Sequence, residues 1–210
     1  MRYLDFDNWL RLWDAIRAKG DAVLVYDRLL ATHSEPPRHY HGLQHMSECL
    51  TEFEEARTLA RQPDAVELAL WFHDAVYDPR SHQNEERSAG MAGEFLEGAG
   101  LPGLVSRVSE LILSTRTHVT RDDPDAALVV DVDLGILGQP AGRFEQYEAQ
   151  IRAEYEWVPI AEFNSRRAAV LQGFLDRPRI YGTDHFHQKF EQSARRNLTS
   201  SIRRLTGAIS

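Results

Sequence analysis

Closely spaced histidines are the first feature of this sequence that could carry out chemistry. Three of its nine histidines fall within seven positions, in the segment His39-Tyr-His41-Gly-Leu-Gln-His45, shortly after two prolines. If a helix begins near Tyr40, His41 and His45 lie four residues apart on one helix face, so both imidazoles can point at one centre. The spacing is compatible with a shared site, and packing of the two rings in the core or on the surface is the alternative.

Two further segments place acidic side chains in apolar surroundings. His73-Asp74 follows a very apolar stretch at 65–72, and Asp131-Val-Asp133 lies in a second apolar run. An ionised carboxylate is costly in such surroundings unless it is paired or bound to a metal. Local partners are the alternative at each position: a backbone carbonyl for His73, an arginine for Asp74 and a helix end for Asp131.

Together, these segments contain the ligand types of a metal site. A histidine, a His-Asp pair and an aspartate, in that order, provide two imidazoles and two carboxylates, and this mixed set suits Mn, Fe, Co, Ni, Zn or Mg. A purely structural zinc site more often uses cysteine, and the chain has only Cys49. The sequence therefore predicts a divalent cation, one or two per chain, whose identity stays open.

The same residues resemble the signature of the HD superfamily of metal-dependent phosphohydrolases, which consists of a histidine, a His-Asp pair and a distant aspartate. The resemblance covers nearly the whole chain and points to one bacterial branch, generally described only as predicted phosphohydrolases. The metal ligands that it implies are His45, His73, Asp74 and Asp133. The segments that carry it are Arg38-His-Tyr-His41-Gly-Leu-Gln-His45, Trp71-Phe-His-Asp-Ala-Val-Tyr-Asp78, Asn84-Glu-Glu-Arg-Ser-Ala89, Asp131-Val-Asp-Leu-Gly-Ile-Leu-Gly138, Arg179-Ile-Tyr181 and Ala194-Arg-Arg-Asn-Leu198.

The resemblance also implies roles for single residues. In the cyclic-nucleotide phosphodiesterases of the superfamily, the histidine after a tyrosine donates a proton and the histidine four positions later binds the metal. His41 is therefore the expected general acid and His45 the expected ligand. The Asp133-Leu134 pair is similar to the segment that supplies the last metal aspartate in those enzymes, which favours Asp133 over Asp131.

Four more residues are candidate site residues. Arg38 is expected to bind a substrate phosphate through its fork of donors. Asp78 stands where some nucleotide-hydrolysing relatives carry a catalytic acidic pair, although Tyr77 replaces the first acid. Glu86 and His118 recur in phrases similar to those of the branch, and each is expected to line the site, hold a second metal through water or orient a ligand. We assign Asp78 and Glu86 to catalysis and Arg38 and His118 to substrate binding, with surface positions as the alternative.

The elements that must position these residues are expected to be helices. Apolar residues recur at spacings of three and four over ten segments, at 6–18, 22–32, 40–60, 65–76, 84–97, 102–115, 126–137, 144–157, 160–175 and 186–205. The stretch 126–137 is rich in valine, as strands are, but its length favours a buried helix. We expect an all-α fold, a single compact helical bundle like that of an HD domain, over 1–210. The metal-site core would lie at about 38–138, with helices at 140–208 packed on it.

Composition narrows the class of partner and the location. A formal net charge of −8 argues against binding of a nucleic acid polymer, which needs a clustered basic footprint. No apolar run approaches the ~20 residues that span a bilayer, and no signal-peptide pattern opens the chain. Because a single cysteine cannot form an internal disulfide, a cytoplasmic location is expected. We expect a small phosphorylated substrate as partner and no membrane, and a homo-oligomer stays open.

These predictions favour hydrolysis of a phosphate ester, in a nucleotide or another small phosphorylated metabolite, by metal-activated water. Histidine has an unperturbed pKa near ~6.5, so His41 can deliver a proton to the departing oxygen. One alternative is a di-iron oxygenase on the same fold, for which His82 and His118 are the extra histidines. Another is a domain that binds a metal or a nucleotide without turnover, although a structural metal needs no proton donor.

Overall fold

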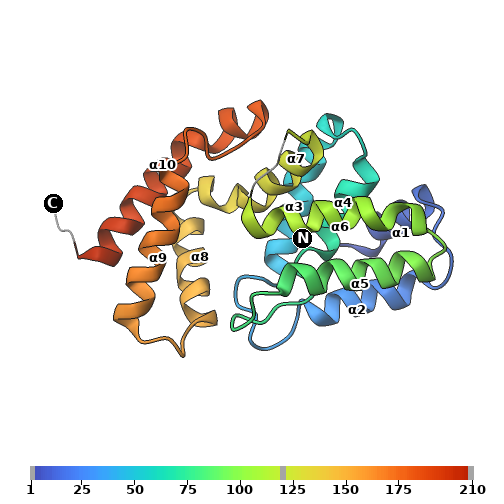
Figure 1. Ribbon diagram of the computed structural model, residues 1–210, viewed down its shortest axis with the longest axis horizontal. Coiled ribbons are helices and arrows are strands. Elements are labelled where there is room, and N and C mark those ends of the chain that lie inside the picture. Colours follow the sequence, from blue (N-terminus) through green and yellow to red (C-terminus); the bar gives the residue numbers. More distant parts are fainter. Residues whose placement is uncertain (1–2, 119–121, 208–210) are drawn as a thin grey trace. The chain divides into compact units, whose positions relative to one another are not determined.

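The computed structural model describes residues 3–118 and 122–207, and every regular element in those residues is a helix (Figure 1). The predicted all-α class is confirmed. The chain forms two compact units, Met1–Asp133 and Leu134–Ser210, and a single domain over 1–210 stays a prediction. None of the described helices combines the length and the apolar character required to cross a membrane.

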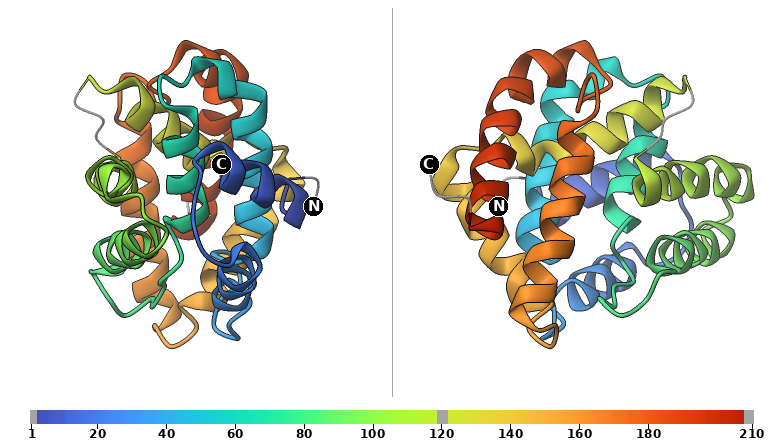
Figure 2. Two further views of the ribbon diagram at one scale, coloured as in Figure 1. Left: turned by 90° about the vertical axis from the view of Figure 1, so that its right-hand side faces the viewer. Right: turned by 60° about the vertical axis from the view of Figure 1, so that its left-hand side comes forward.

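The first unit contains all nine candidate site residues. Its helices are α1 (Phe6–Ala15), α2 (Ala22–Thr32), α3 (Leu43–Ala56), the 3-10 helix η1 (Arg57–Leu59), α4 (Pro63–Phe72), α5 (Asn84–Gly98), α6 (Pro102–Thr117) and α7 (Pro124–Asp133). Helices α5 and α6 lie side by side, as both Figure 1 and Figure 2 show.

Helix α4 is the central helix of the first unit. It packs against α1, α3, α5, α6 and α7, and every residue at 65–72 is buried. The ring of Trp71 lies 5.1 Å from that of Trp9 on α1, measured between centroids. Burial of apolar surface is the main force that holds such a helix in place. Because His73 and Asp74 follow α4 directly, the helix carries this pair into the interior of the unit.

Helix α7 is fastened to the beginning of α4. The fully buried Asp125 carboxylate accepts the backbone N–H groups of Arg61 at 2.7 Å and Gln62 at 3.1 Å, just before α4 begins. Arg107 on α6 donates to the same carboxylate at 2.9 Å. These bonds hold the first turn of α7 against α4 and α6, and the helix then places Asp133 at its last position.

The predicted helix at 40–60 begins later and ends earlier than expected. Helix α3 begins at Leu43, because the backbone of Gly42 is extended, with φ −124° and ψ −163°. It ends at Ala56, where the 3-10 helix η1 begins. His41 therefore precedes α3, and the expected helical pairing of His41 with His45 on one face is wrong.

The predicted helix at 65–76 also ends early. Helix α4 ends at Phe72, and the chain turns at His73. The next two backbone carbonyls, of Asp74 and Ala75, accept hydrogen bonds from the Arg38 side chain instead of continuing the helix. This early end turns the His-Asp pair out of the helical register.

The second unit begins at the residue after Asp133. It consists, in its described residues, of the 3-10 helix η2 (Leu134–Gly138), α8 (Ala141–Glu154), α9 (Ile160–Leu175) and α10 (Asp184–Thr206), with α10 packed against α9 and η2 (Figure 2). The Tyr181 hydroxyl donates to the Leu134 carbonyl at 3.0 Å, and the Asn197 amide donates to the Leu137 carbonyl at 2.9 Å. The stretch 126–137 is helical, as predicted, but it consists of two elements, because α7 ends at Asp133 and the 3-10 helix η2 follows.

Candidate metal centre

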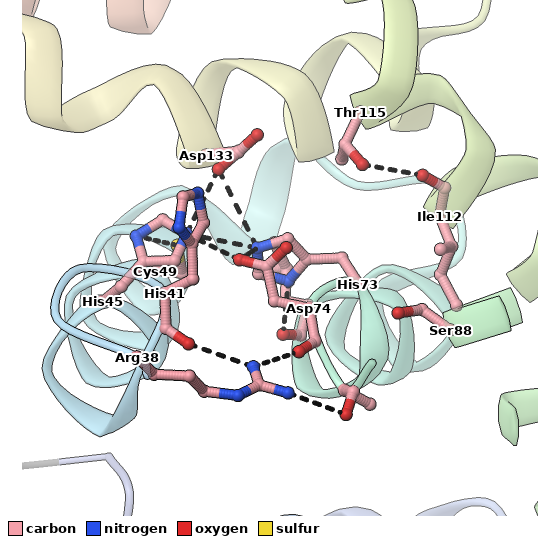
Figure 3. A network of polar contacts seen from close by, with 12 residues as sticks. Arg38, His41, His45, Cys49, His73, Asp74, Ser88, Ile112, Thr115 and Asp133 are labelled. Carbon is pink, nitrogen blue, oxygen red and sulfur yellow. Dashed lines mark hydrogen bonds and ion pairs between the residues drawn. The ribbon is translucent and has the colours of Figure 1, made fainter. Parts of the chain in front are cut away.

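The four predicted metal ligands converge in the interior of the first unit (Figure 3). The Nε2 atoms of His45 and His73 are 3.2 Å apart. Asp74 Oδ2 lies 3.5 Å from the first and 3.3 Å from the second, and Asp133 Oδ1 lies 3.2 Å and 3.8 Å from the same two atoms. Three helices therefore bring two imidazoles and two carboxylates to one point: α3, the end of α4 and the end of α7.

The hydrogen bond of the His73 ring determines which nitrogen faces this point. Nδ1 lies 2.9 Å from the Leu70 carbonyl oxygen, and because a carbonyl only accepts, Nδ1 carries the proton. In the neutral ring, Nε2 then presents its lone pair to the other donor atoms. This arrangement, with the second ring nitrogen bonded to a carbonyl, is common among metal-binding histidines.

The charges of the group require positive charge at its centre. Burial by itself would lower the pKa of His73, but the Asp74 and Asp133 carboxylates outweigh burial and raise this pKa to about 9. Burial would raise the pKa of Asp74, yet the surrounding histidines, His73 foremost, hold it well below its usual range. Protons on the imidazoles balance the carboxylates in this arrangement, and a divalent cation would supply the same charge.

The donor set also fits a cation on structural grounds. Asp74 Oδ2 is a buried atom that lies 3.3 Å from His73 Nε2 and 3.5 Å from His45 Nε2, and a buried carboxylate oxygen is costly without positive charge beside it. Two imidazole nitrogens and two carboxylate oxygens are ligands that Mn, Fe, Co, Ni and Zn accept, and Mg accepts the oxygens. The residues present therefore suit a divalent metal ion.

Cys49 is a member of the group that the sequence reasoning did not assign. Its thiol and ligand atoms of His45, His73 and Asp133 all lie within 4.8 Å of one another, so that this buried group could hold a metal ion. Sγ rests beside the ring of His45, 3.6 Å from Nδ1 and 3.7 Å from Nε2, and burial raises the pKa of the thiol. The sequence feature that could have identified Cys49 is its spacing of four residues from His45, which places both side chains on one face of a helix.

His41 lies beside the four ligands although it is not on α3. Its ring centroid is 6.1 Å from that of His45, and its ring stacks on Tyr77 at 4.1 Å with an angle of 25° between the planes. The turn before α3 and the turn after α4 thus meet at this stacked pair. Tyr77 supplies the surface on which the imidazole of His41 rests.

Arg38 does not present the open guanidinium that a phosphate clamp requires. Its side chain is 1 % exposed, and it donates to the backbone carbonyls of His41 at 3.0 Å, Asp74 at 2.5 Å and Ala75 at 3.1 Å. Figure 3 shows these bonds on the side of Asp74 away from Asp133. The guanidinium therefore ties the turn of His41 to the turn of Asp74, and the geometry gives no support to substrate binding by Arg38.

His118 reaches the group from the end of α6. Its Nε2 atom lies 3.5 Å from Asp133 Oδ2, and its side chain is 22 % exposed. The proximity to the cluster agrees with its selection as a candidate, but the contact is with a metal-ligand candidate. Binding of a substrate by His118 stays a prediction.

Asp78 and Glu86 lie elsewhere in the first unit. The exposed Asp78 accepts the backbone N–H of Arg80 at 2.9 Å within a turn. Glu86 on α5 forms an ion pair with Arg116 on α6. Neither of these interactions involves the ligand group, and the catalytic roles of Asp78 and Glu86 stay predictions. In contrast, the preference for Asp133 over Asp131 agrees with the arrangement, because Asp133 is the aspartate that faces the two imidazoles.

Comparisons with known proteins add no relative to this description. No family model matches the chain, and no curated protein or solved structure matches it either. The case for function thus rests on the residues and their geometry.

Proposed function

We propose that this protein is a metal-dependent hydrolase of phosphate esters. The observation that carries the proposal is the convergence of His45, His73, Asp74 and Asp133 on one buried point, with His41 next to them. The carboxylates of Asp74 and Asp133 are only 16 % and 18 % exposed, and two such groups near one point are costly without a cation. A histidine outside the ligand set provides a group that can move a proton. A small phosphorylated molecule, such as a nucleotide, is the substrate class we propose.

The four ligands would hold one divalent ion. Such an ion supplies Lewis acidity toward a phosphoryl oxygen and makes water acidic enough to act as the nucleophile near neutral pH. The bond from His73 Nδ1 to the Leu70 carbonyl holds the ring so that Nε2 points at the centre. Asp74 and Asp133 contribute negative charge, which favours a dication over a single charge.

His41 would act as the general acid. Loss of an ester oxygen requires a proton, and a histidine can donate one near neutral pH. The stacking of His41 on Tyr77 limits rotation of the imidazole, and Arg38 holds the His41 carbonyl. Together these contacts would hold the imidazole of His41 beside the reacting group, already oriented to donate its proton.

The test combines elemental analysis with activity. Protein purified without added chelator is analysed for bound metals, then stripped and reloaded with Mn²⁺, Co²⁺, Zn²⁺ or Mg²⁺ in turn. Each form is assayed for release of phosphate or alcohol from a panel of phosphomonoesters and phosphodiesters. We expect hydrolysis that requires the metal and is lost in Asp133→Asn. Tight nucleotide binding with no hydrolysis in any metal form would instead assign the protein to non-catalytic sensors.

A further inference from the structure

His118 has a backbone conformation that is unusual for a residue with a side chain. It follows α6 directly and adopts the left-handed region, with φ 52° and ψ 39°. This region brings Cβ close to the following carbonyl oxygen, so glycine, and to a lesser degree asparagine, is favoured there. A helix end of this kind commonly carries glycine, so a histidine there has a backbone cost that contacts of its side chain must offset.

The side chain of His118 contacts one of the four proposed ligands. The two oxygens of Asp133 face different partners: Oδ1 lies 3.2 Å from His45 Nε2, and Oδ2 lies 3.5 Å from His118 Nε2. Asp133 is the last residue of α7, at the junction with the 3-10 helix η2, which begins at Leu134. A partner on Oδ2 therefore limits rotation of the carboxylate and directs Oδ1 at the imidazoles.

We infer that His118 is a positioning residue, which holds Asp133 so that it offers a single oxygen, Oδ1, to the metal ion. The left-handed backbone at the end of α6 directs the ring of His118 toward α7, and the ring in turn orients the carboxylate. This inference rests on the proposed metal site, and it assigns His118 a role through Asp133 in place of a direct contact with the substrate.

The test compares two variants that both accept the left-handed backbone. His118→Gly removes the side chain, and His118→Asn keeps a shorter N–H donor. Metal-stripped proteins are titrated with Zn²⁺ in competition with a chromophoric chelator, which gives affinity and stoichiometry without any enzyme assay. Thermal unfolding of the stripped proteins is measured in parallel.

We expect the affinity of His118→Gly for Zn²⁺ to fall about 10- to 100-fold, as is common when a residue that orients a metal ligand is lost. The Tm of the stripped variant should equal or exceed that of the wild type, because glycine relieves the backbone. His118→Asn should recover part of the lost affinity. A loss of metal affinity without a loss of stability separates positioning from a merely structural role.

Arg17 offers a matched control. It is exposed, and it also has a positive φ, of 56°, shortly after the end of α1. Arg17→Gly should relieve its backbone in the same way and leave the affinity for Zn²⁺ unchanged.

Three results would overturn the inference. The first is an affinity of His118→Gly for Zn²⁺ equal to that of the wild type. The second is an equal loss of Zn²⁺ affinity in His118→Gly and His118→Asn. The third is a fall from two bound ions to one in His118→Gly, which would make His118 a ligand of a second ion. Absence of Zn²⁺ binding by the wild type would instead reject the metal site itself. If the affinity for Zn²⁺ falls in His118→Gly as expected but the wild type hydrolyses no phosphoester, only the proposed reaction is rejected.

Discussion

The Nε2 atoms of His45 and His73 lie 3.2 Å apart, and each also lies within 4 Å of carboxylate oxygens from Asp74 and Asp133. Two neutral imidazoles would meet at this distance with their lone pairs opposed unless a proton or a cation lay between them. The four side chains come from three separate segments of the chain. Their meeting is therefore a property of the packed first unit, and it can be probed by binding, stability and pH.

Metal binding should stabilise the folded protein. A ligand that binds only the native state, at a free concentration about 100 times its Kd, adds about 2.7 kcal/mol, which corresponds to a rise in Tm of roughly 5–10 °C for a chain of this size. We expect such a rise when Zn²⁺ or Mn²⁺ is added to the stripped wild type, followed by calorimetry. Asp74→Asn, which removes one charge at nearly constant volume, should abolish most of the rise, and an equal rise in both proteins would exclude Asp74 as a ligand.

Replacement of His41 should separate catalysis from metal binding. In His41→Ala we expect kcat to fall about 10²- to 10⁴-fold, the range typical of a lost general acid, while metal content per chain stays at the wild-type value. Elemental analysis and steady-state kinetics on the same preparation provide the measurement. The neighbouring exposed residue His39 provides the control, since His39→Ala should leave both quantities unchanged. Loss of the metal in His41→Ala would make His41 a ligand.

Replacement of Arg38 should act on stability. Arg38→Met keeps the apolar stem and removes the donor to three backbone carbonyls, that of Ala75, which is buried, and those of His41 and Asp74, which are partly buried. Each lost bond of this kind costs about 1–3 kcal/mol, so we expect a loss of about 3 kcal/mol or more in the free energy of unfolding, measured by urea denaturation. Wild-type stability combined with a raised KM would restore the predicted role of Arg38 as a phosphate clamp.

The buried His33 should make stability depend on pH. Burial, with a smaller contribution from Arg38, lowers its pKa to about 4 against the opposing effect of the Leu29 carbonyl, so the folded protein keeps the ring neutral. In the unfolded chain the ring has a pKa near ~6.5 and takes up a proton first. The stabilising contribution is therefore complete above about pH 6.5 and is lost as the pH falls toward 4.

This dependence can be isolated by comparison with His33→Gln, which does not titrate. Between pH 7 and pH 5, the wild type should lose about 2 kcal/mol more free energy of unfolding than the variant. Urea denaturation of both stripped proteins at the two pH values provides the measurement. Parallel curves for the two proteins would show that His33 is not held neutral.

The sequence by itself determined the helical class and the approximate position of each helix, because apolar periodicity is a local property that packing preserved in α1 through α10. It also indicated that Asp74 and Asp133 need a partner, since desolvation penalises both carboxylates wherever their apolar segments are buried. These inferences need only the residue types and their near neighbours along the chain.

Only the tertiary structure decided which side chain meets which partner. Arg38 donates to backbone carbonyls 36 and 37 positions away. His118, at the end of α6, contacts Asp133, at the end of α7, and Glu86 pairs with Arg116. The beginning of α3 at Leu43 also depended on the local backbone of Gly42. Such contacts depend on the packing of helices and on where each helix ends, and several partners of similar charge compete for each group. Residue type and spacing therefore predicted the chemistry of the site, and packing assigned each residue its place in it.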